Sequence, residues 1–198
     1  MSLFIKVCGV TSELAGAACV EAGVDAVGFV FDKSPRRVSP ETAADLAAGL
    51  PGSMLKVAVF RRPTPLEVEL LLQVFPADVV QADHDALPSI SAPAVLPVYR
   101  EGAGPGPKRG GRFLYEGPMS GAGMAVDLGR AARLAGRGEM VLAGGLDAAN
   151  VARVIETVRP FGVDVSSGVE SQPGIKDPGR IHEFVAAARA SAERLAPA

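Results

Sequence analysis

Two glycine turns near the end of the chain are well suited to binding a phosphate. Gly144-Gly145 follows the apolar run Met140–Ala143, and Ser166-Ser167-Gly168 follows Gly162–Val165. Glycine lets the backbone come close to an anion, while backbone amides and serine hydroxyls can donate to its oxygens. A single pair of this kind is more often only a tight turn, but two on consecutive strands favour an anion site.

The spacing between the turns indicates that they share one edge of a sheet. Asp147 resembles an N-cap, and the apolar residues Val151, Val154, Ile155 and Val158 recur at helical spacing. Two strands joined through a helix run parallel, so both turns follow carboxyl ends of strands. In an eight-stranded (β/α) barrel, the loops after strands 7 and 8 commonly bind phosphate.

Three further residues lie where chemistry is expected in such a barrel, at or after strand ends. Cys8 ends the first expected strand, Arg36 follows the second, and Asp127 follows the sixth. Each has a simpler interpretation: a buried thiol, a solvated pair with Arg37, and a helix N-cap. A thiol, a guanidinium, a carboxylate and a phosphate site on one face nevertheless favour catalysis.

The elements that must position these residues alternate along the chain as strands and helices. We expect a single (β/α)8 TIM barrel over 1–198, with about seven helices and with a loop in place of the helix after strand 5, because residues 102–107 are rich in Gly and Pro. Caps are expected at Thr11, Ser39, Thr64 and Asp177. The expected strands are 3–8, 25–31, 55–60, 78–81, 94–99, 112–116, 140–143 and 162–165.

Composition narrows the class of protein. The 198 residues are 48% hydrophobic, which is enough for one buried core. The net charge is −2 and the sequence has no basic cluster, which argues against a nucleic-acid surface. No apolar run has membrane-spanning length, so we expect no membrane association. Two cysteines are too few for a disulfide framework or a zinc cage, which favours a reducing cytoplasm.

Several motifs together resemble those of the phosphoribosylanthranilate isomerases of tryptophan biosynthesis, in order along nearly the whole chain. The first and last are the most specific. They are Lys6-Val7-Cys8-Gly9-Val10-Thr11, Gly28-Phe29-Val30-Phe31, Ser34-Pro35-Arg36-Arg37-Val38, Leu142-Ala143-Gly144-Gly145-Leu146, and Asp164-Val165-Ser166-Ser167-Gly168-Val169-Glu170 with Pro173-Gly174-Ile175-Lys176-Asp177.

The resemblance implies a cofactor-free and metal-free Amadori rearrangement of N-(5-phosphoribosyl)anthranilate. It places Cys8 as general base and Asp127 as general acid, Arg36 at the anthranilate carboxylate, and Gln81 and the two glycine turns around the substrate. A cysteine is a base only as thiolate, with an ordinary pKa of about 8.5. Lys6 or the substrate iminium would have to favour that form. The expected assembly is a monomer or a homodimer.

The chain also departs from the family pattern. Where the family shows Gln-Leu-His-Gly after strand 4, this chain has Gln81-Ala82-Asp83-His84. Because a one-residue slip reverses side-chain direction in a strand, either the strand ends early and His84 enters the site, or Asp83 replaces it. Arg62 replaces an asparagine common in the family, Val126 and Leu128 replace aromatic residues, and Ala122 stands at a position where a hydroxyl residue is common.

Two alternatives remain at this stage. The isomerase of histidine biosynthesis performs the same rearrangement on another phosphoribosyl amine, but that family has an aspartate at the end of strand 1, a two-fold internal repeat and two phosphate sites. This chain has Cys8 there and no visible repeat. A catalytically silent barrel that binds a phosphorylated ligand is the other alternative, and the strand 4 departure keeps it open.

Overall fold

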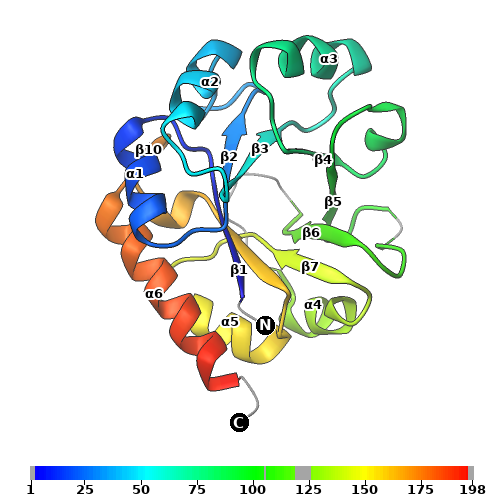
Figure 1. Ribbon diagram of the computed structural model, residues 1–198. Helices are drawn as coiled ribbons and strands as arrows, with labels where there is room; N and C mark the ends of the chain where they lie inside the picture. The colour runs from blue at the N-terminus through cyan, green and yellow to red at the C-terminus, as the bar shows by residue number, and fades with distance from the viewer. Residues whose placement is uncertain (1–2, 105, 119–125, 196–198) are drawn as a thin grey trace.

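The computed structural model describes residues 3–104, 106–118 and 126–195, which form a closed parallel barrel surrounded by helices (Figure 1). The strands pair in sequence order and β1 closes the barrel on β8, as the alternation of elements predicts. The barrel strands are β1 Phe4–Cys8, β2 Ala26–Val30, β3 Leu55–Val59, β4 Val79–Asp83, β5 Val95–Arg100, β6 Arg112–Glu116, β7 Glu139–Leu142 and β8 Gly162–Val165.

Six α-helices are described, one fewer than the expected count of about seven. The β5–β6 connection has no helix in its described residues, as predicted, but the β4–β5 connection also has only the short 3₁₀ helix η1, Leu87–Ser89. The helices are α1 Glu13–Glu21, α2 Pro40–Ala48, α3 Pro65–Val74, α4 Leu128–Ala135, α5 Val151–Val158 and α6 Pro178–Leu195.

Helix starts follow the local sequence with two corrections. Ser39 caps α2 with Pro40 at its first position, and Thr64 forms the expected capping box with Glu67. The cap of α1 is Ser12 rather than Thr11, because the Thr11 hydroxyl donates instead to the carbonyl oxygen of Gly174.

Helix α5 also starts later than the sequence suggests. Asn150 rather than Asp147 occupies its N-cap position, and the carboxylate of Asp147 accepts from the amides of Ala149 and Asn150 in a turn before the helix. An aspartate that satisfies nearby amides in a turn has the same sequence signature as an N-cap.

Two apolar layers follow from the two faces of the strands. A small cluster fills the barrel interior, and a larger cluster packs the outward strand residues against the helices. The interior cluster consists of Leu96, Val98, Leu114, Val141 and Ala143. Because side chains alternate along a strand, the remaining inward positions toward the carboxyl ends are left for polar groups.

An antiparallel hairpin of β9 Glu170–Gln172 and β10 Ile175–Lys176 follows β8 and was not predicted from the sequence. Its turn residue Gly174 has a φ of +87°, and a side chain there would overlap the carbonyl oxygen of Pro35. The hairpin therefore packs on the loop after β2, at the carboxyl end of the barrel. No helix in the described part of the chain is long and apolar enough to cross a membrane.

Candidate active site

A cavity of about 250 Å³ opens at the carboxyl ends of the strands. Its lining includes predicted site residues from five separate parts of the chain, so the barrel brings together positions far apart in sequence. These lining residues are Cys8, Arg36, Gln81, Gly144, Gly145, Ser166 and Ser167. The location agrees with the rule that chemistry in this fold occurs at the carboxyl ends of the strands.

Cys8 lies on the same face of β1 as Lys6, and both are buried. Lys6 is paired in register with Asp164 of β8, and its ammonium lies 2.8 Å from the Asp164 carboxylate. A Cβ at Gly28 of β2 would meet both the Cys8 sulfur at 3.1 Å and the Lys6 nitrogen at 3.2 Å. Glycine at position 28 thus leaves room for the thiol and the ammonium side by side.

Burial and charge act against each other in this group. Burial raises the pKa of the Cys8 thiol, while the Lys6 ammonium opposes that increase. Burial lowers the pKa of Lys6, but Asp164 and Cys8 outweigh it and hold that pKa above its ordinary value, which favours the charged ammonium. Burial raises the pKa of Asp164, and Lys6 opposes the increase.

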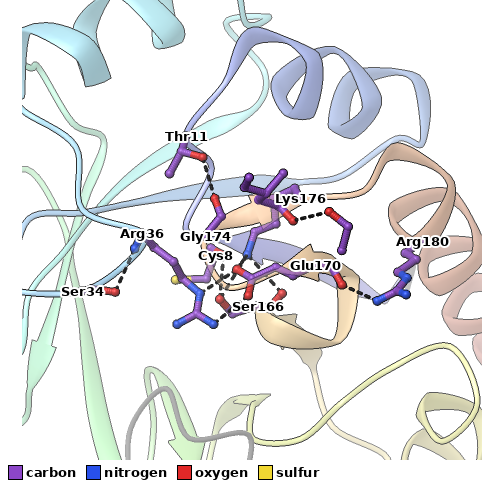
Figure 2. Close-up of polar contacts among 11 residues, drawn as sticks. Cys8, Thr11, Ser34, Arg36, Ser166, Glu170, Gly174, Lys176 and Arg180 are labelled. Carbon is purple, nitrogen blue, oxygen red and sulfur yellow. Dashed lines mark hydrogen bonds and ion pairs between the residues drawn. The ribbon is translucent and has the colours of Figure 1, made fainter.

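Arg36 is held in place by the hairpin (Figure 2). Its Nε and Nη2 donate to the two carboxylate oxygens of Glu170 at 2.7 and 2.8 Å, a bidentate pair. Lys176 donates to the same carboxylate at 2.7 Å. A side chain at Gly9 would meet the Arg36 Cδ at 2.6 Å, so glycine is needed for Arg36 to reach this position. The adjacent Arg37 points elsewhere and donates to the carbonyl oxygen of Phe31.

The turn after β7 has the properties expected of an anion site. Gly144 and Gly145 have φ values of +101° and +65°, a conformation that side chains rarely adopt. Among the described residues, their amides donate no hydrogen bond, and both glycines line the cavity. Backbone amides at a site of this kind are normally satisfied by a ligand or by water.

The turn after β8 is used in part for structure. The Ser166 hydroxyl donates its proton to the carbonyl oxygen of Cys8 at 2.9 Å, and Lys176 donates to Ser166. Gly168 does not line the cavity, and a side chain on it would overlap the carbonyl oxygen of Leu146. Ser167 is exposed and lines the cavity. Of this turn, the Ser167 side chain is therefore the group best placed to meet a ligand.

Asp127 lies outside the lining of this cavity in the described residues. Its carboxylate caps α4 by accepting from the amide of Arg130 at 2.8 Å, and its own amide donates to the carboxylate of Glu101. Its neighbours Val126 and Leu128 line a smaller pocket that shares Gly144 and Gly145 with the main cavity. Asp127 thus lies in the chain between two residues that share a pocket with the turn after β7, but it lines neither cavity. Ala122 lies outside the described residues.

The choice between Asp83 and His84 is resolved by the length of β4. The strand continues through Asp83, whose buried carboxylate faces inward and lies 2.6 Å from the Arg100 guanidinium. The His84 ring stacks on Tyr99 with centroids 4.4 Å apart, in the outer layer. Asp83 therefore takes the inward position and pairs with Arg100, and neither Asp83 nor His84 is among the described residues that line the cavity.

Several charged cavity residues were missed by reasoning from the sequence. Glu116 and Asp164 line the cavity, and Arg100 pairs with Glu116 at 2.8 Å. The signal was available as period-two alternation: Asp164 precedes Ser166 by two positions, as Lys6 precedes Cys8. The partners of Arg36 were harder to find because they depend on the unpredicted hairpin. Among the described residues, no cluster of three or more His, Cys, Asp or Glu side chains could hold a metal ion.

Sequence comparisons find a matching protein family and several relatives of this chain. A family model described as N-(5'-phosphoribosyl)anthranilate (PRA) isomerase matches residues 111–187. The N-(5'-phosphoribosyl)anthranilate isomerase of Paracoccus denitrificans is 38% identical to this chain, in an alignment that covers 96% of this chain and 99% of that protein. The enzyme of Geobacter sulfurreducens is also 38% identical, with 93% and 98% covered.

Solved structures of related proteins have a fold similar to that of this chain. TrpF from Jonesia denitrificans superposes with a TM-score of 0.83 at 34% identity, covering 96% of this chain and 98% of that one. Phosphoribosyl anthranilate isomerase from Thermotoga maritima gives a TM-score of 0.81 at 29% identity, with 95% and 99% covered. The fold is a (β/α)8 barrel, and the relatives place the chain in the isomerase class. The chain belongs to the phosphoribosylanthranilate isomerase family.

Proposed function

We propose that this protein isomerises N-(5-phosphoribosyl)anthranilate to 1-(2-carboxyphenylamino)-1-deoxyribulose 5-phosphate in tryptophan biosynthesis. The observation that carries the proposal is the joint presence, in one cavity, of Cys8, the Arg36 guanidinium and two backbone amides after β7 that donate to no other described residue. A related structure contains the reduced form of the same product bound to its enzyme. The enzyme is an intramolecular aldose-ketose isomerase.

The two ends of the substrate match the two anion-binding parts of the cavity. The phosphate binds at the amides of Gly144 and Gly145, with Ser167 beside them. The anthranilate carboxylate binds the Arg36 guanidinium, which the Glu170 carboxylate holds in one orientation. A planar guanidinium fork suits a planar carboxylate. The phosphoribosyl group then spans the space between, next to Cys8 and Gln81.

The rearrangement requires one acid and one base. Asp127 donates a proton to the furanose ring oxygen, which breaks the C1′–O bond and gives an iminium. The Cys8 thiolate removes the C2′ proton, and the electron pair of that C–H bond forms the C1′=C2′ bond of the enolamine. The enolamine then gains a proton at C1′ and loses the hydroxyl proton at C2′, which gives the ketone. The roles of Cys8 and Asp127 follow from the resemblance to the family. Cys8 lines the cavity, and Asp127 lies between Val126 and Leu128, which line the adjoining pocket.

The test is turnover of freshly prepared substrate, followed by the fluorescence of its anthranilate group. Cys8→Ser and Asp127→Asn should each lose at least about a hundredfold in kcat with KM little changed, since a positioned acid or base contributes about 10²–10⁴-fold. The substrate of the histidine-pathway isomerase should not be turned over. An active Asp127→Asn variant would move the acid to Glu116 or Asp164, which line the cavity.

We further propose a reducing cytoplasmic compartment, because a catalytic Cys8 must remain an unoxidised thiol. We also propose that the protein is a monomer or a homodimer. One solved relative from Thermotoga maritima is described as dimeric, with monomers generated from it. Size-exclusion chromatography with light scattering distinguishes these two states.

A further inference from the structure

The charged side chains around Cys8 carry a net positive charge when Cys8 is a neutral thiol. Among the described residues, the charged groups that face the thiol are Lys6 from β1, Asp164 from β8, Lys176 from β10 and Arg36 from the loop after β2. Their remaining partner is Glu170, which binds both Arg36 and Lys176. Three cations therefore share two carboxylates, so a Cys8 thiolate would face an excess of positive charge before the substrate carboxylate binds Arg36.

Of the three cations, Lys6 is best placed to pair with a thiolate at Cys8. Its side chain is fully buried, and its nitrogen and the Cys8 sulfur approach the same point above Gly28, at 3.2 and 3.1 Å. Asp164 fixes the ammonium from β8 at 2.8 Å, which leaves further N–H donors for the thiol side. Burying a lysine is costly unless it is paired, and the Asp164 carboxylate supplies that partner from the adjacent strand.

We propose that Lys6 is a positioning residue for the base, holding the thiolate of Cys8 with an ammonium that is itself anchored on Asp164. This inference rests on the proposed function only in that Cys8 is the base. Lys6 does not contact the reacting carbon; it acts through Cys8. Arg36 and Lys176 are already bound by Glu170, so they compensate the thiolate less directly.

The proposal predicts opposite effects for the two members of the ion pair. Without the Lys6 cation, the Cys8 pKa should rise, and without the Asp164 anion it should fall, because a nearby opposite charge favours ionisation and a like charge disfavours it. A merely structural pair would behave differently: removal of either member would damage the site in the same direction.

The experiment measures the rate of iodoacetamide alkylation of Cys8 against pH, which needs no turnover. Lys6→Met should lower the alkylation rate at neutral pH by about tenfold or more, since a close opposite charge shifts a pKa by about 1–3 units. Asp164→Asn should raise the rate. The pH dependence of kcat/KM should move in the same directions. Lys108→Met, at an exposed position in the β5–β6 connection, is the matched control and should change neither profile.

Two further variants keep the outcome decisive. Lys6→Met/Asp164→Asn removes both members of the ion pair, so it should fold where a single variant does not. Its alkylation should be slower than that of Asp164→Asn, because only Lys6 differs between these two variants. Cys8→Ser gives the background from Cys19, whose pKa burial raises to about 12. An unchanged alkylation profile in the Lys6 variants, or shifts of the same sign for both single variants, would overturn the inference. An active Cys8→Ser enzyme would instead overturn the assignment of the base.

Discussion

At the scale of single residues, the cavity separates side chains that act from neighbours of the same type that do not. Arg36 and Arg37 are adjacent, yet one is held bidentately beside Cys8 and the other is exposed and bonded to a carbonyl. Gly145 and Gly168 are both turn glycines, yet one lines the cavity and the other packs between two loops. Residue type alone does not make these distinctions, but the direction of each side chain or amide does.

The first prediction uses the arginine pair. Arg36→Ala should weaken binding of the substrate, raising KM by an amount equivalent to about 1.5–3 kcal/mol, the usual worth of a hydrogen bond to a charged group. Arg37→Ala is the matched control, with nearly unchanged kinetics expected. Steady-state KM and kcat, with the fold checked by circular dichroism, decide the matter. Equal losses in both variants would show that Arg36 has no special place in the site.

A second prediction concerns the phosphate turn. Gly145→Ala places a side chain at a φ of +65° and disturbs the amide that we assign to the phosphate, so KM should rise strongly while the protein stays folded. Inorganic phosphate should inhibit the wild type competitively and the variant less. Gly168→Ala is unsuited to this purpose, because its side chain overlaps the Leu146 carbonyl and should destabilise the fold. A normal KM in Gly145→Ala would remove this turn from the phosphate site.

At the scale of elements, the order and type of strands could be predicted, and their exact lengths could not. Apolar runs bounded by glycine or by helix caps locate all eight strands. The pattern does not show that β4 continues to Asp83, because its last inward position is filled by an acid whose partner, Arg100, lies on the next strand. The hairpin after β8 also escapes prediction, since its strands are very short and depend on contacts with the loop after β2.

The same reasoning explains which parts of the site could be predicted. Cys8, Arg36, Gln81 and the glycine turn after β7 lie at the cavity because strand ends are readable from sequence. Charged neighbours such as Asp164 and Glu170 become functional only through pairing across strands that are distant in sequence. Long-range register decides those pairs, and local patterns do not encode it.

The third prediction compares the two residues at the end of β4. Asp83→Ala removes one partner of a largely buried arginine and should lower the free energy of unfolding by about 1–3 kcal/mol. His84→Ala loses the ring stack with Tyr99 and should cost about 0.5–1.5 kcal/mol, with kcat unchanged. Urea unfolding and turnover of the same samples provide both values. A large loss of kcat with normal stability in His84→Ala would return the histidine to the active site.

At the scale of the whole molecule, the β9–β10 hairpin connects the last part of the chain to the first. It follows β8, lies against the loop after β2, and presents Glu170 to Arg36 and to Lys176 (Figure 2). Thr11 also bonds to the hairpin at Gly174. The hairpin therefore stabilises the barrel closure and orients the carboxylate-binding guanidinium with the same set of contacts. A perturbation of Glu170 should accordingly be visible both in stability and in substrate binding.

The last prediction follows from the charge state of Glu170. Burial raises the pKa of this carboxyl, but the bonds from Arg36 and Lys176 outweigh burial and hold the pKa below its ordinary value. A group whose pKa is depressed on folding contributes stability above its unfolded pKa, about 4.3 for glutamate, and loses that contribution as the pH falls through the folded value. Glu170→Gln should thus be less stable than the wild type by about 1–3 kcal/mol near pH 6, and the difference should shrink as the pH falls below about 4. Urea unfolding across this pH range measures the difference, with Glu183→Gln, at an exposed position on α6, as the control that should show none.

The KM of Glu170→Gln should also rise at neutral pH, because Arg36 loses its bidentate partner. A stability difference that stayed constant down to about pH 3 would mean that the contribution of Glu170 to folding does not depend on its charge.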